Sequence, residues 1–208
     1  MTLIKRFLLL AVPIAAVLAG GTVLAVRALT MPAAEQQSST TATAGPHVGG
    51  PFTLVNSAGQ PVTDKAYAGK WLLVYFGYTY CPDVCPTTLN NIAQALAKLG
   101  PDAQKITPIF ITVDPKRDTP KVMGQYVKSF DPRIIGLTGS AAQIAAVAKE
   151  YHVYYSAEPD KGDGAYLVDH SSFVYLMTPR GILAKVMPGT TTGAEMATAI
   201  SPLVDSAS

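Results

Sequence analysis

Two cysteines, Cys81 and Cys85, are the residues whose type and spacing most directly suggest chemistry, and they are the only cysteines among 208 residues. A disulfide closing so short a loop removes little entropy from the unfolded chain, which makes it a poor structural staple. The thiolate form of cysteine is both a nucleophile and a metal ligand. The pair is therefore predicted to be reactive or metal-binding, and close enough for reversible disulfide formation.

The elements on either side of this pair indicate how it is positioned. Residues 71–76 form a continuous apolar run, typical of a buried strand, and residues 87–99 show apolar residues at helical spacing. A helix N-terminus lowers the pKa of nearby thiols through its positive dipole end. If the helix starts near Cys81, positions i and i+4 share one face, and both sulfurs point to the same side. Three residues separate the cysteines, against two in the C-x-x-C redox motif.

The remaining pattern predicts an α/β domain. Strands and helices alternate, which favours a largely parallel sheet covered by helices, and a late hairpin adds antiparallel strands. Sheets of this kind place their sites at the carboxyl ends of strands. Trp71, Tyr78 and Tyr80 are expected to be packing residues. The further strands are expected at 52–55, 61–63, 106–113, 133–137, 153–155, 166–168, 172–177 and 182–186, and the further helices at 119–130, 140–151 and 192–204.

An uncharged apolar stretch occupies residues 7–26, the length that a membrane-spanning helix needs. Lys5 and Arg6 precede it, which predicts a cytoplasmic N-terminus and an exported remainder. An uncleaved anchor is the favoured interpretation, and a signal peptide cut near Ala19 or Ala25 is the alternative.

These features predict a single-pass protein of the inner membrane, whose main domain lies in the periplasm or an equivalent extracytoplasmic space. The segment after the apolar stretch is rich in Ala, Ser, Thr, Gln and Gly, as in flexible tethers. The predicted parts are a cytoplasmic N-terminus at 1–6, the transmembrane anchor or signal peptide at 7–26, the tether at 27–47 and a folded domain at 48–208.

The charge of the chain argues against a nucleic-acid partner. Lys5, Arg6 and Arg27, set against Glu35, account for the whole formal net charge of +2. The part after Glu35 therefore has no net charge, whereas nucleic-acid binding calls for a basic patch.

A metal site would need a third ligand besides the two sulfurs. Two soft thiolates suit Cu(I), and an added imidazole also suits Cu(II), whereas a closed structural zinc site needs four ligands. The chain has three histidines. His47 lies in the tether, His152 at a helix end where a surface or capping role is expected, and His170 in a turn between two strand-like segments. Local chemistry alone indicates that His170 is an ordinary surface residue.

Three motifs occur in order along the chain: CPDVCP at 81–86, VDPKRDTP at 113–120 and VDHS at 168–171. Together they resemble the Sco/SenC/PrrC family of copper-binding assembly factors for cytochrome c oxidase, over roughly residues 48–203. The resemblance implies a thioredoxin-like fold, with a central mixed sheet flanked by helices, preceded by one transmembrane helix.

The resemblance also implies roles for individual residues. Cys81, Cys85 and His170 become the ligands of one copper ion, and the two cysteines can also form a redox disulfide. Asp83 and Asp169 are candidates to support these ligands from outside; alternatively, Asp83 complements the helix dipole and Asp169 is a solvated turn acid. The implied partners are cytochrome c oxidase subunit II and another periplasmic copper chaperone.

Two functions stay open. The first is a metallochaperone that delivers copper to the dinuclear copper site of subunit II and is not an enzyme with turnover. The second is a thiol-disulfide oxidoreductase that uses only the cysteine pair to reduce the cysteines of that site, because thiolate attack needs the same lowered pKa. A peroxidase acting through one cysteine is a more distant third.

The middle motif contributes Asp114, Arg117 and Asp118. They are expected either to form a cluster that faces a partner or orders a loop, or to belong to a solvated loop that caps the next helix. Asp118 or Thr119 is the predicted N-cap of that helix, with Pro120 in its first turn.

Overall fold

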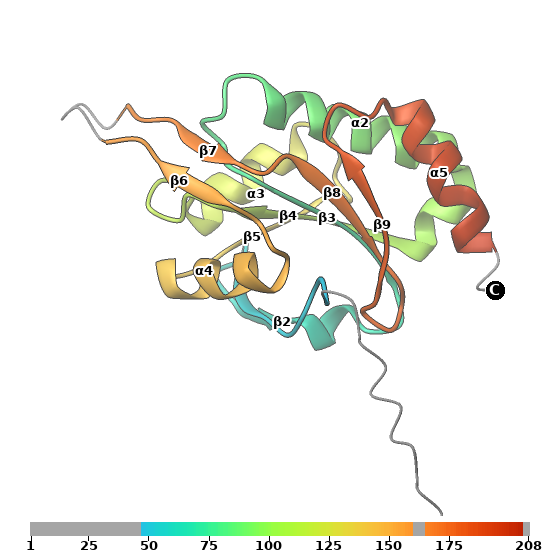
Figure 1. Ribbon diagram of the computed structural model, residues 1–208, viewed down its shortest axis with the longest axis horizontal. Coiled ribbons are helices and arrows are strands. Elements are labelled where there is room, and N and C mark those ends of the chain that lie inside the picture. The colour runs from blue at the N-terminus through green and yellow to red at the C-terminus, as the bar shows by residue number, and fades with distance from the viewer. Residues whose placement is uncertain (1–46, 160–164, 206–208) are drawn as a thin grey trace, which may run out of the picture. The chain divides into compact units, whose positions relative to one another are not determined.

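The computed structural model of the chain describes residues 47–159 and 165–205 (Figure 1). The strands are β1 (Thr53–Asn56), β2 (Pro61–Thr63), β3 (Trp71–Gly77), β4 (Ile106–Thr112), β5 (Ile135–Thr138), β6 (Tyr155–Ala157), β7 (Val168–His170), β8 (Phe173–Met177) and β9 (Leu183–Pro188). The α-helices are α2 (Val84–Leu99), α3 (Pro120–Lys128), α4 (Ala141–Glu150) and α5 (Gly193–Asp205), and two 3₁₀ turns are η1 (Asp64–Tyr67) and η2 (Gly100–Lys105).

The strands form a seven-stranded mixed sheet in the order β2-β1-β5-β4-β3-β8-β9, and β6 and β7 form a separate two-stranded sheet. Neighbours β3, β4 and β5 are parallel, whereas β8 and β9 are antiparallel additions at one side. The expected α/β domain with a mixed central sheet flanked by helices is confirmed.

The two central strands explain the apolar runs of the sequence. Every residue of β3 and of β4 is buried. The two strands pair in parallel from Trp71 opposite Ile106 to Gly77 opposite Thr112. Because their carboxyl ends meet at one edge of the sheet, the loops that follow Gly77 and Thr112 emerge side by side.

Alternate residues of β3 face the two layers of helices. Tyr75 stacks on Phe110 at 5.8 Å between ring centroids, and Phe110 in turn contacts Tyr126 of α3 at 5.8 Å. Phe76 points the other way and packs on Tyr151, just after α4, at 5.2 Å. Figure 1 shows α2 and α5 side by side, across the sheet from α4.

Helix starts follow the capping signals of the sequence where such signals exist. Thr119 caps α3 by accepting a hydrogen bond from the Val122 amide, and Pro120 occupies the first turn, as expected. Ser140 caps α4 in a reciprocal capping box with Gln143.

His170 departs from its expected position, because it is the last residue of β7 rather than part of a turn. Its partner in the two-stranded sheet is Tyr155. Among the described residues, no helix is both long and apolar enough to cross a membrane. The predicted membrane segment at 7–26 lies outside the described residues, as does nearly all of the predicted tether.

Gly77, the last residue of β3, offers a test of how tightly this edge is packed. A Cβ at this position would lie 2.6 Å from Cys85 Sγ and 2.9 Å from Phe110 Cε2. We therefore expect Gly77→Ala to lower the free energy of unfolding by about 1–3 kcal/mol through overpacking, measured by urea denaturation. Gly50→Ala is the matched control, because its Cβ would meet only the side chain of Glu150, which can rotate away. Equal stability of the two variants would contradict the tight packing.

Candidate metal centre

Cys81 and Cys85 lie at the carboxyl edge of the sheet, but not on one helix as expected. Helix α2 begins at Val84, so Cys85 is in its first turn while Cys81 lies in the preceding loop. Pro82 disfavours the helical conformation for Cys81, the residue before it, which accounts for the position of Cys81 outside the helix. The backbone amide of Cys85 nevertheless donates to Cys81 Sγ at 3.4 Å. Helix α2 therefore supplies an amide donor to the Cys81 sulfur, although Cys81 lies outside the helix.

The two sulfurs differ in their protonation. A hydrogen bond from the Cys85 thiol lowers the pKa of Cys81 to about 3, against the opposing effect of burial and with help from the backbone amides of Asp83 and Cys85. Burial raises the pKa of Cys85, and the neighbouring Cys81 raises it further. These opposite shifts in pKa favour a thiolate on Cys81 and a proton on Cys85.

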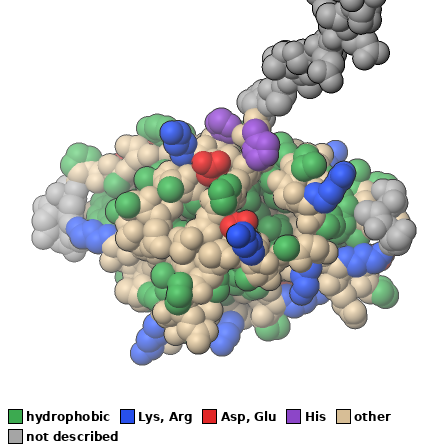
Figure 2. Space-filling model, turned by 90° about the horizontal axis from the view of Figure 1, so that it is seen from below, with side chains coloured by type: hydrophobic (Ala, Val, Ile, Leu, Met, Phe, Trp, Pro, Cys, Tyr) green, Lys and Arg blue, Asp and Glu red, His purple; other side chains and the backbone are tan. Residues whose placement is uncertain are grey.

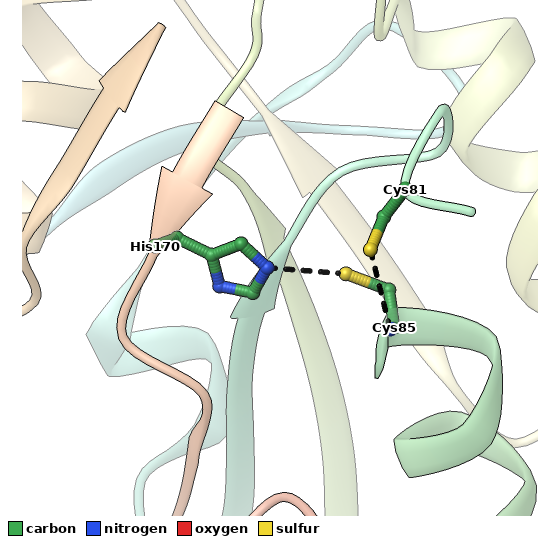
Figure 3. Close-up of side chains that lie close together, drawn as sticks. All are labelled: Cys81, Cys85 and His170. Atoms are coloured by element: carbon green, nitrogen blue, oxygen red, sulfur yellow. Dashed lines mark hydrogen bonds between the residues drawn. The ribbon is translucent and has the colours of Figure 1, made fainter. Parts of the chain in front are cut away.

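His170 approaches this pair from β7. Its Nε2 lies 3.4 Å from Cys85 Sγ (Figure 3). Its Nδ1 lies 3.2 Å from the carbonyl oxygen of Ser171. A proton on Nδ1 can be donated to that carbonyl, which leaves the lone pair of Nε2 facing the sulfur. The backbone oxygen of Ser171, rather than the carboxylate of Asp169, thus orients the ring.

The ligand atoms of Cys81, Cys85 and His170 all lie within 4.8 Å of one another. Within the described residues, they form the one group of three or more His, Cys, Asp or Glu side chains close enough to hold a metal ion. Both cysteines are buried and His170 is half-buried. Two soft sulfur donors and one imidazole make a donor set suited to copper.

Two aromatic rings enclose the centre. The rings of Tyr75 and Tyr78 meet that of His170 edge-on, at 6.3 Å and 5.9 Å between centroids. The Tyr75 hydroxyl donates to Cys85 Sγ at 3.6 Å and lies 3.4 Å from Ser172 Oγ. The sequence interpretation did not single out Tyr75, although a tyrosine within a fully buried strand signals that its hydroxyl needs a partner.

The other two histidines do not belong to the centre. His152 is exposed in a left-handed conformation (φ 53°) just after α4, and its Nε2 lies 3.1 Å from the carbonyl oxygen of His47. Figure 2 shows two histidine side chains together on the face of the molecule seen there. The expectation of a surface residue at a helix end is confirmed for His152.

The two aspartates proposed to support the ligands are both exposed. Asp83 is the N-cap residue of α2, but its side chain makes no capping hydrogen bond. Its backbone amide, not its carboxylate, interacts with the Cys81 sulfur. Asp169 lies opposite Ser156 in the two-stranded sheet.

Asp114, Arg117 and Asp118 of the middle motif are not solvated, which corrects the second interpretation given above for these three residues. Asp114 and Asp118 are 4% and 0% exposed, and the Arg117 side chain is 12% exposed. Burial raises the pKa of Asp118, against hydrogen bonds from Thr112 and Thr79 that lower it.

Of the aromatic residues expected to pack, Trp71 and Tyr78 are buried, but Tyr80 is 60% exposed.

Comparison with known proteins identifies a family whose model matches this chain. Residues 40–205 match the family model described as SCO1/SenC. The chain is 46% identical to the mitochondrial SCO2 homolog of Mus musculus over 150 residues, which are 71% of this chain and 59% of that protein. It spans about half the length of the curated relatives it matches.

Solved structures with the same fold include that of Bradyrhizobium japonicum ScoI with copper bound. It has 46% sequence identity and a TM-score of 0.69, and the match covers 74% of this chain and 98% of that one. BsSco, described as a member of the Sco family of cytochrome c oxidase assembly proteins with a disulfide switch, has 27% identity and a TM-score of 0.61, over 78% of this chain and 94% of that one.

The sharing of one proton between the sulfurs can be tested by titration. Cys85→Ala removes the thiol that donates to Cys81, so the pKa of Cys81 should rise from about 3 toward the ordinary value of about 8.5. The measurement is the thiolate ultraviolet absorbance of the reduced, metal-free protein as a function of pH. At about pH 5 the parent chain should show a thiolate signal that the variant lacks. His152→Ala should leave the curve unchanged, and a parent chain without thiolate at that pH would refute the assignment.

Proposed function

The chain belongs to the SCO1/SenC family, and we propose that it binds one copper ion through Cys81, Cys85 and His170. The convergence of these three ligand atoms within 4.8 Å of one another carries the proposal. The copper-bound structure of a 46% identical relative supports it. Because Nδ1 of His170 is directed at a carbonyl, Nε2 is the nitrogen that would coordinate the metal.

The charge of the centre also favours copper. Cys81 is held as a thiolate by its neighbours, and Cys85 can give up its proton when a cation takes the place of that proton between the sulfurs. Soft thiolates favour Cu(I), and the imidazole also accommodates Cu(II). The low exposure of both sulfurs would keep bulk water away from the bound ion.

The biological role that we propose is assembly of cytochrome c oxidase. The ion would be cargo, delivered to the dinuclear copper site of subunit II, with another extracytoplasmic copper chaperone as its source. Membership of the family supports this role, and BsSco is described as a member of a family of oxidase assembly proteins. The protein would act as a metallochaperone and carry out no turnover of its own.

We propose further that residues 7–26 anchor the chain in the inner membrane, with 1–6 in the cytoplasm and the folded domain at 48–208 in the periplasm or its equivalent. The absence of charge from 7–26 and the preceding Lys5 and Arg6 support this arrangement. In this proposal, residues 27–47 are the tether between the anchor and the folded domain.

A second function, thiol-disulfide exchange, is favoured by the unequal protonation of the two cysteines. The Cys81 thiolate would attack one sulfur of a partner disulfide, form a mixed disulfide and release one partner thiolate. Cys85 would then lose its proton, attack the Cys81 sulfur and release the second partner thiolate. Two electrons pass to the partner, and a Cys81–Cys85 disulfide remains. The cysteines of the oxidase copper site are the partner disulfide that we propose.

Copper binding is tested by titrating the full chain and its His170→Ala variant with Cu(I) and Cu(II). Loss of one of three ligands should weaken Cu(I) binding by at least about tenfold, which corresponds to 1.4 kcal/mol, and should change the visible spectrum of the Cu(II) form. His152→Ala is the matched control and should bind copper like the parent chain. Unaltered stoichiometry, affinity and spectrum in His170→Ala would exclude the three-ligand site.

Thiol exchange is tested with an oxidised peptide that carries the two cysteines of the oxidase copper site. Cys85→Ser should trap the mixed disulfide through Cys81, because the resolving sulfur is missing, and mass spectrometry would detect the adduct. Cys81→Ser should form no adduct, since the remaining thiol is buried and protonated. His170→Ala should still reduce the peptide. No reduction by the parent dithiol would remove this function and leave the copper proposal standing.

A further inference from the structure

The loop between β4 and α3, residues 113–119, contains three buried charged side chains whose role is not explained by helix capping, because Thr119 caps α3 by itself. Asp118 is wholly buried, and Asp114 and Arg117 nearly so. Buried charges are unfavourable unless they are paired and hydrogen-bonded. The partners of these three residues therefore indicate what the loop does.

Asp118 holds the segment that leads to the cysteines. Its Oδ2 accepts from the Thr79 amide at 3.0 Å, and its Oδ1 accepts from the Thr79 hydroxyl at 2.6 Å. Oδ2 also accepts from Thr112 Oγ1 at 2.6 Å. Thr79 is two residues before Cys81, so the loop fixes the backbone from which Cys81 projects.

Asp114 and Arg117 hold the segment that leads to His170. The Tyr166 hydroxyl donates to Asp114 Oδ1 at 2.8 Å, while Arg117 Nε donates to Asp114 Oδ2 at 2.5 Å. The guanidinium carbon lies 3.6 Å from the centroid of the Tyr166 ring. Tyr166 is four residues before His170 in the chain.

Arg117 also contacts the segment that leads to the cysteines. Its guanidinium carbon lies 4.6 Å from the ring centroid of Tyr80, the residue next to Cys81. A direct contact joins the same two segments, because the amide of Val168 donates to the Tyr78 hydroxyl at 3.2 Å. The aromatic rings on both sides and the carboxylate of Asp114 thus meet around one guanidinium.

These contacts matter because His170 lies outside the main sheet. Within the described residues, strands β6 and β7 pair only with each other, and Figure 1 shows them extending away from the seven-stranded sheet. At the end where His170 lies, the hairpin continues into β8, and the Gly189 amide donates to the Ser172 carbonyl oxygen at 2.8 Å. The segment that leads to His170 is held against the cysteine side by side-chain contacts such as those of Tyr166 and Tyr78.

We propose that the 113–119 loop is a bracket that joins the two halves of the metal centre, and that Arg117 is the positioning residue at its middle. Arg117 sets the distance of His170 from the cysteines without touching the metal. This inference rests on the proposed copper site. A planar guanidinium suits the role, since it can stack on aromatic rings and donate to a carboxylate at the same time, which a lysine cannot.

The test is a double-mutant cycle on the full chain. Arg117→Met keeps the length of the aliphatic stem and removes the guanidinium, so it should weaken Cu(I) binding by about tenfold to a hundredfold, as loss of a supporting residue does. In the His170→Ala background the same change should have no further effect, because the ligand that it positions is absent. Arg117→Lys should recover only a small part of the lost affinity.

Arg133→Met is the matched control. Arg133 also forms a two-point pair with a nearby aspartate, Asp131, but it precedes β5 and so lies at the amino ends of the parallel strands. The Arg133→Met variant should leave copper affinity unchanged. Equal loss in both backgrounds of the cycle, or no loss on removal of the guanidinium, would overturn the proposal.

The metal-free protein supplies an independent readout. Arg117→Met should accelerate amide hydrogen exchange at residues 166–170 but not in α5, and Tyr166→Phe, which removes only the hydroxyl, should act in the same direction with a smaller effect. Tyr166→Phe also replaces Arg117→Met in the cycle if the latter fails to fold. Unchanged exchange at 166–170 would refute the bracket. Failure of the parent chain to bind copper would instead refute the proposed function. Amide hydrogen exchange at 166–170 would still test whether the 113–119 loop holds this segment.

Discussion

Burial of the Cys85 sulfur is the constraint on which the rest of the centre depends. The residue has no exposed surface, and a single added carbon at Gly77 would collide with its sulfur. A sulfur in such a position cannot turn to water, so its neighbours decide its protonation and reactivity. Those neighbours are the hydroxyl of Tyr75, the imidazole of His170 and the sulfur of Cys81. Glycine at the end of β3 leaves room for the Cys85 sulfur itself.

The centre combines two parts of the fold that differ in how they are held. The cysteines follow β3, which pairs with strands on both sides, and they are held by the sheet, by α2 and by the contact of Asp118 with Thr79. His170 belongs to a hairpin outside that sheet. The proposed metal site therefore combines one half on the main sheet with one half on this hairpin, an arrangement compatible with the copper uptake and release that we propose.

Local signals predicted much of the fold but left particular errors. The buried strands β3 and β4 and the caps Thr119 and Ser140 were found because apolar runs and capping residues act within a few positions. No local signal marks the start of α2, because Asp83 makes no side-chain cap. The prediction that Tyr80 is a packing residue is wrong, since an aromatic ring near the end of a buried strand gives no local sign of its exposure.

The spacing of the two cysteines after a buried strand predicts a reactive or metal-binding pair from the sequence alone, because the features behind this prediction are neighbours in the chain. Tertiary contacts place His170 beside the pair and bury Asp114, Arg117 and Asp118. Both features depend on contacts between residues far apart in sequence, such as Cys85 and His170, which are 85 positions apart. Such contacts arise from the way the sheet and the hairpin bring distant parts of the chain together, and no local sequence pattern predicts them.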